Sequence, residues 1–85
     1  MSQLPASILT YLLQLARTYS GRDAQPGDRI YRDLDINGGD FLEFVVAVEL
    51  HFGVDLSWVS PHDPKAEAQD PTIEALANDV FRQQR

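Results

Sequence analysis

The stretch that decides the fold is Asp33–Gly53, which reads DLDINGGDFLEFVVAVELHFG. It opens with acidic residues and two glycines, and then runs almost entirely apolar until Gly53. Phe44–Val48 is rich in β-forming residues, but the apolar run is longer than a usual strand and its polar members do not alternate. Asp40 and Glu43 also have the spacing of a helix-capping box. The stretch therefore predicts a central helix, preceded by a loop that holds any site the chain carries.

A helical wheel of this stretch separates two apolar sides. The broader side, which we expect to face the core, consists of Phe41, Phe44, Val45, Val48 and Phe52. A second stripe, at positions i, i+4 and i+8, consists of Leu42, Val46 and Leu50, and it is bordered by Glu43 and Glu49. Because a surface helix needs only one apolar face, the second stripe is either further core or a partner-binding site.

Two other long helices are predicted from apolar residues at helical spacing. The first covers Pro5–Tyr19, with Pro5 in its first turn, and Ser20 and Gly21 end it. The last follows Thr72, a favourable N-cap residue. The expected core stripes consist of Ile8, Leu12, Leu15, Ala16 and Tyr19 in the first helix, and of Ile73, Leu76, Ala77, Val80 and Phe81 in the last.

The connections complete the expected fold. Arg22–Gly39 is a long loop, expected to contain one short turn at Arg29–Tyr31, and loops of this length usually carry function. Its apolar residues, which we expect to pack against the helices, are Ile30, Tyr31, Leu34 and Ile36. The proline-rich stretch Ser57–Pro71 is expected to be mostly irregular, with a short third helix near Pro64–Gln69. The sequence thus predicts one all-α domain over residues 1–85, a four-helix bundle with a long first loop.

Length and composition limit the possible classes of protein. Eighty-five residues make a single domain, and the absence of cysteine excludes disulfides and thiolate metal sites. With 44% hydrophobic and 24% charged residues, the chain has the composition of a globular protein rather than a disordered one. No apolar run approaches the ~20 residues that span a bilayer, and the first residues lack the pattern of a signal peptide. We therefore expect a cytoplasmic protein.

The net charge of −6 is unevenly distributed. Asp33–Pro64 contains no Lys or Arg, and its acidic residues are Asp33, Asp35, Asp40, Glu43, Glu49, Asp55 and Asp63. Such a field repels nucleic acid and anionic lipid, and it favours basic protein surfaces or cations. Solubility alone also accounts for an acidic surface, so the charge does not by itself define a site.

The sequence does not predict an enzyme. Nucleophilic catalysis needs a Ser, Cys or Lys close to a base that a third group orients. His51 lies between apolar neighbours of the central helix and His62 lies in the proline-rich stretch, and neither has such a partner at an informative spacing. A paired-carboxylate mechanism would need a pocket, for which a domain of this size has little room.

A calcium loop is a weaker alternative. Asp33, Asp35 and Asn37 followed by Gly38 reproduce the first half of such a loop, in which side-chain oxygens at alternate positions converge on the cation. The bidentate glutamate expected six residues after the glycine is replaced by phenylalanine. Glu43 lies one position early, which rotates its carboxylate by ~100° around a helix. The other interpretation is that these residues make turn and cap hydrogen bonds.

The order of these elements resembles an acyl carrier protein over most of the chain. The residues that carry the likeness are Asp33 and Leu34 before the central helix, the acidic central helix itself, Phe52-Gly53-Val54-Asp55-Leu56 after it, and Thr72-Ile73 at the start of the last helix. Asp33–Ser57 is similar above all to small carrier-like bacterial proteins of unknown role that lack the serine to which phosphopantetheine is attached.

The serine of carriers has no counterpart here. In the ungapped register it falls on Gly38, and in a second register, which leaves the central helix three residues short, it falls on Phe41. Neither residue has a hydroxyl, and no Ser or Thr lies between Ser20 and Ser57. The resemblance therefore implies a carrier-type fold without the phosphopantetheine cofactor.

Carriers bind their partners through the central helix, where acidic residues surround an apolar centre. Transferred position by position, the implied partner-binding residues are Gly39, Asp40, Leu42, Glu43, Val46, Glu49 and Leu50. Leu50 is apolar where carriers often have an acid. The resemblance thus implies a protein-interaction module for a basic, partly apolar partner surface. Two alternatives remain open, a homodimer through the second stripe and a carrier that holds an acyl ligand without a covalent link.

Overall fold

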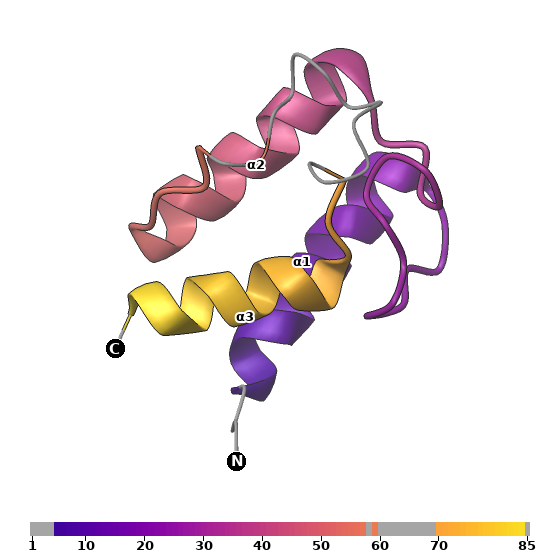
Figure 1. Cartoon of the computed structure of the whole chain (residues 1–85). Coiled ribbons are helices and arrows are strands. Elements are labelled where there is room, and N and C mark those ends of the chain that lie inside the picture. Colours follow the sequence, from indigo (N-terminus) through magenta and orange to yellow (C-terminus); the bar gives the residue numbers. More distant parts are fainter. Residues whose placement is uncertain (1–4, 58, 60–69, 85) are drawn as a thin grey trace.

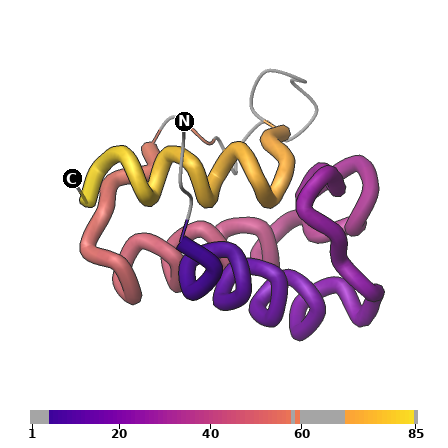
Figure 2. Tube along the Cα trace, turned by 90° about the horizontal axis from the view of Figure 1, so that it is seen from below, coloured from indigo at the N-terminus to yellow at the C-terminus, as the bar shows by residue number. Residues whose placement is uncertain are grey.

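A computed structural model describes residues 5–57, 59 and 70–84 of the chain. The described residues form three helices and no strand: α1 (Ala6–Ser20), α2 (Gly38–Phe52) and α3 (Ile73–Gln83). α2 runs back alongside α1, and α1 packs against both α2 and α3 (Figures 1 and 2). The all-α class is confirmed. The short third helix expected near Pro64–Gln69, and with it the four-helix count, falls outside the described residues.

α1 ends as expected but starts one residue later. Pro5 is the N-cap with an extended backbone, rather than a residue of the first turn. Gly21 ends the helix in the left-handed conformation and donates its N–H to the Arg17 carbonyl at 2.9 Å. The buried side chains of α1 are Ile8, Leu12 and Ala16, and its partly buried ones include Leu15 and Tyr19. The predicted stripe therefore does face the core.

α2 begins earlier than the sequence indicated. Its N-cap is Asn37, whose side chain makes no capping hydrogen bond. Asp40 is the third residue of the helix, so the capping box predicted for Asp40 and Glu43 is wrong. Asp40 still suits the first turn, where a negative charge is favourable near the positive end of the helix dipole. Gly53 ends α2 in the left-handed conformation, as expected.

α3 follows its predicted pattern. The Thr72 hydroxyl accepts a hydrogen bond from the Ala75 N–H at 3.0 Å, which confirms it as the N-cap. The buried apolar side chains of α3 are Ile73, Leu76, Ala77 and Val80, and Phe81 is partly buried. Asp79 is also buried and is paired with Arg82. The apolar pattern of α3 did not predict a buried charged residue at this position.

The long loop before α2 is held against the start of α3. The Ile30 N–H donates to the Pro71 carbonyl at 3.2 Å, and the Ile73 N–H donates to the Asp28 carbonyl at 3.0 Å. The buried Asp70 carboxylate accepts the N–H groups of Tyr31 and Arg32 at 2.7 and 3.0 Å. The turn expected at Arg29–Tyr31 is thus present and is capped by a residue far away in the sequence. Ile30 within this turn is buried, as are Leu34 and Ile36 after it, as predicted.

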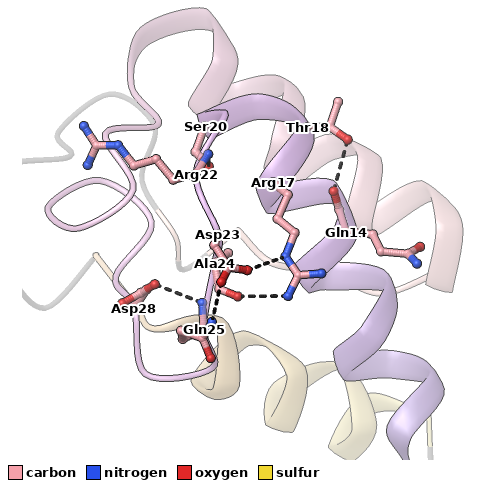
Figure 3. A network of polar contacts seen from close by, with 9 residues as sticks. All are labelled: Gln14, Arg17, Thr18, Ser20, Arg22, Asp23, Ala24, Gln25 and Asp28. Atoms are coloured by element: carbon pink, nitrogen blue, oxygen red, sulfur yellow. Dashed lines mark hydrogen bonds and ion pairs between the residues drawn. The ribbon is translucent and has the colours of Figure 1, made fainter.

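The start of this loop is tied back to α1 by polar contacts. The Arg17 guanidinium donates to the Ala24 carbonyl at 3.3 Å and pairs with Asp23 at 3.4 Å (Figure 3). Asp28 accepts the Gln25 N–H at 2.9 Å and closes the adjoining turn. These contacts fix the path of the chain between α1 and the turn that precedes α2.

Candidate functional site

Three large apolar side chains of α2 are exposed, and we call Leu42, Val46 and Leu50 the exposed row. Their exposed fractions are 45%, 37% and 80%. On the other side of the same helix, Phe41, Phe44, Val45 and Val48 are buried. The side chains of the second stripe are therefore not part of the core.

The polar residues predicted to surround the row lie on two edges. At ~100° per residue, Glu43 and Glu49 project ~60° to either side of Val46, and Asp40 lies further around on the Glu43 side. Gly39, Asp40 and Glu43 are exposed, whereas Glu49 is half-buried. All seven predicted partner-binding residues therefore lie within one helix, but they do not have equal access to solvent.

The Glu43 edge lies next to the end of α1. The Tyr19 hydroxyl donates a long hydrogen bond of 3.4 Å to Glu43 Oε1, and the Tyr19 ring packs edge-on against Phe44 at 6.2 Å between centroids. Partial desolvation of Tyr19 raises the pKa of its phenol above the ordinary value, and the Glu43 carboxylate raises it further through its charge and this hydrogen bond. Asp40 contributes in the same direction. This edge is an exposed anionic surface.

On the other edge, Glu49 has a structural role. Glu49 Oε2 accepts the Leu56 N–H at 2.8 Å and so holds the segment that follows α2. Gln83 at the end of α3 fixes the same segment, because its amide bonds both the N–H and the carbonyl of Asp55, at 2.8 and 2.7 Å. The sequence placed Glu49 among the docking residues. It did not indicate this structural role, since the contact depends on where the chain returns after Gly53.

Gly38 is the first residue of α2 and has a φ of 58°. L-residues rarely adopt this left-handed conformation, and a non-glycine residue there costs about 1 kcal/mol. A Cβ atom on Gly38 would have no atom within 4 Å, so space does not exclude a side chain. The backbone therefore suits glycine at the position that, in the ungapped register, corresponds to the carrier serine. Phe41, the position in the second register, is buried in the core.

The residues of the calcium alternative make other polar contacts in the structure. Asp33 Oδ2 accepts the Arg29 N–H at 2.8 Å, and Asp35 Oδ1 accepts from the Asn37 amide at 3.0 Å. Glu43 contacts Tyr19 instead. In the part of the chain that the structure describes, no three His, Asp or Glu side chains gather as a metal site would require. The turn part of the other interpretation fits these hydrogen bonds, whereas the Asn37 side chain does not cap α2.

His51 contributes to an aromatic contact between α1 and α2. Its ring stacks on Tyr11 with 3.9 Å between centroids and 9° between planes, and Phe52 meets both rings edge-on. His51 is therefore an exposed residue whose ring packs between the two helices. His62 lies outside the described residues.

Comparison with known protein families, with characterised proteins and with solved structures gives no match. Among the described helices, none is both long and apolar enough to cross a bilayer. The exposed row of α2 and the residues around it are therefore the features that bear on function.

Proposed function

We propose that the chain is a protein-interaction module of acyl-carrier type that carries no phosphopantetheine and binds a partner protein through α2. The proposal includes a fourth, short helix near Pro64–Gln69 and action in the cytoplasm, both of which the sequence led us to expect. The main support for a partner-binding role of α2 is the exposed row. Its three large apolar side chains lie on a helix whose opposite face already contributes to the core. Exposed apolar surface bordered by polar residues is characteristic of interaction sites.

Charge supports a partner with basic residues. Asp40 and Glu43 are exposed beside the row, and the stretch Asp33–Pro64 to which they belong contains no Lys or Arg. Complementary charge increases the association rate and helps to reject wrong partners, while the apolar row supplies contact area. A symmetric dimer through the same face would bring like charges together, so charge disfavours a second copy as the occupant.

Intact-mass analysis of the chain, expressed with and without a phosphopantetheinyl transferase, tests whether phosphopantetheine is absent. We expect the same mass in both samples, because Gly38 and Phe41 have no hydroxyl to modify. A mass increase equal to the mass of an attached phosphopantetheine group would overturn this part of the proposal. A functional carrier treated in parallel confirms that the transferase is active.

The docking surface is tested by comparing the proteins retained on the immobilised chain and on a Val46→Ser/Leu50→Ser variant. We expect specific partners to be lost from the variant, since it removes apolar contact area at the centre of the row. A Gln14→Ser variant on the exposed side of α1 is the matched control. If both variants retain the same proteins as the unmodified chain, the row is not a docking surface.

A further inference from the structure

The two edges of the exposed row differ in the charge that they offer to a partner. On one edge Asp40 and Glu43 are exposed, and Glu43 accepts a long hydrogen bond of 3.4 Å from the Tyr19 hydroxyl. On the other edge Glu49 is half-buried and binds the Leu56 N–H at 2.8 Å. A partner cation therefore finds two accessible carboxylates on the Asp40 side, but on the Glu49 side it must compete with a backbone hydrogen bond.

The apolar row itself has the form of a helix-packing ridge. Leu42, Val46 and Leu50 recur every four residues and extend for about 12 Å along α2. Such i, i+4 ridges fit into the grooves of another helix, and helical partners use the same spacing for their apolar anchors. A partner helix with apolar residues at this spacing would cover the row.

We propose that the exposed row binds an amphipathic helix of a basic partner, and that the one-sided charge of the row sets the direction in which this helix runs. The inference rests on the docking function proposed above. Turning a bound helix end to end exchanges its two flanks. A helix whose cations lie on one flank therefore reaches Asp40 and Glu43 in only one of the two directions.

The geometry specifies the direction for each flank. Glu43 lies three residues before Val46 in α2. Each helix has two flanks, which hold the residues three positions before and three positions after its apolar residues. In an antiparallel pair of helices the two "before" flanks face each other, whereas in a parallel pair the "before" flank of one helix faces the "after" flank of the other. A partner with lysines three residues before its apolar anchors should thus run antiparallel to α2. A partner with lysines three residues after those anchors should run parallel to it.

Two synthetic helical peptides of identical composition test this. Each has three leucines at every fourth position and three lysines, placed three residues before the leucines in one peptide and three residues after them in the other. A nitroxide at the peptide N-terminus broadens nearby amide signals of the isotope-labelled protein. Gly39 and Gly53, about 20 Å apart along α2, report which end the nitroxide approaches.

We expect broadening mainly at Gly53 with the first peptide and mainly at Gly39 with the second. Surface ion pairs of ordinary strength should populate the favoured direction about threefold to tenfold over the other. The double substitution Asp40→Asn/Glu43→Gln should abolish this preference. Glu49→Gln, which keeps a side-chain acceptor for the Leu56 N–H, should preserve it.

The possible failures are distinguishable. If the amides of Leu42, Val46 and Leu50 shift but both peptides bind in the same direction or in both, the inference on direction is wrong and the docking surface stands. If neither peptide shifts these amides, the docking function fails together with the inference. Shifts of the same amides with protein concentration alone would assign the row to a second copy and would also overturn the proposal.

Discussion

The two apolar sides of α2 contain similar residue types in very different surroundings. Phe41, Phe44 and Val48 are completely buried. Leu42, Val46 and Leu50 lie on the same helix, with Leu50 80% exposed. The free energy of burial depends on the area removed from water, so only the first set stabilises the isolated fold to a large extent.

The contrast indicates which residues are available for function. A residue of the buried side cannot change without disturbing α1 and the long loop that pack around it. The exposed row carries no such structural constraint in the isolated chain, and exposure of this much apolar surface gains nothing for folding. This exposure is the reason why the proposed partner is assigned to this side.

Truncation of one residue on each side gives the largest expected difference. Phe44→Ala removes a fully buried ring and leaves a cavity, so we expect the free energy of unfolding to fall by about 3–5 kcal/mol. Leu50→Ala removes mostly exposed methyl groups, and we expect a change within about 0.5 kcal/mol. Urea unfolding monitored by circular dichroism measures both.

The domain is small, and Phe44→Ala could leave too little stability for a measurable transition. Phe44→Leu, which removes less volume, should then give a smaller loss in the same direction. Equal losses for the Phe44 and Leu50 substitutions would mean that Leu50 is covered in solution, and the distinction between the two sides would be wrong.

The helices could be predicted from the sequence because their signals are local. Apolar residues at helical spacing identified the buried sides of α1, α2 and α3, and they separated the exposed row from the core side of α2. Thr72, Gly21 and Gly53 marked helix ends through their own side-chain or backbone chemistry. The start of α2 was predicted less well, because Asp40 and Glu43 have the spacing of a capping box but lie inside the helix.

The roles of Asp70 and Glu49 could not be predicted because they depend on contacts with other segments of the chain. Asp70 caps a turn almost forty residues earlier in the chain, where it accepts the N–H groups of Tyr31 and Arg32. Glu49 has the same sequence context as Glu43, at the edge of one apolar stripe. Only the path of the chain after Gly53 shows that one of them holds the fold while the other remains exposed.

The difference between Glu49 and Glu43 gives the second prediction. Glu49→Ala removes the acceptor of a part-buried backbone N–H, so we expect a loss of about 1–2 kcal/mol in the free energy of unfolding. Glu43→Ala loses only a long, exposed contact, and we expect a change within about 0.5 kcal/mol. Urea unfolding compares the two, with Glu49→Gln as the variant that keeps an acceptor.

Hydrogen exchange locates the effect. Glu49→Ala should accelerate exchange of the Leu56 amide specifically, since this N–H loses its partner. If Glu43→Ala were as destabilising as Glu49→Ala, or if Leu56 exchange were unchanged, the assignment of a structural role to Glu49 alone would be wrong. In that case both edges of the exposed row would be coupled to the fold.

The smallest predicted effect concerns the pKa of Tyr19. Replacing Glu43 by Gln removes a negative charge and the carboxylate acceptor, both of which favour the neutral phenol. We therefore expect Glu43→Gln to lower the pKa of Tyr19 toward the ordinary value of 10.0, with partial desolvation retaining some of the increase. Phenolate absorbance measures the titration, and subtracting a Tyr19→Phe variant removes the contributions of Tyr11 and Tyr31.

The sign of the stability change follows from the direction of this pKa shift. Because folding raises the pKa of Tyr19, the contribution to stability is complete below the unfolded pKa and is lost as pH rises through the folded pKa. Glu43→Gln should therefore reduce the loss of stability in alkaline solution. Glu49→Gln, at the opposite edge, should leave the Tyr19 titration unchanged. An equal effect of both substitutions would show that the two edges act on Tyr19 alike, contrary to the contact that only Glu43 makes.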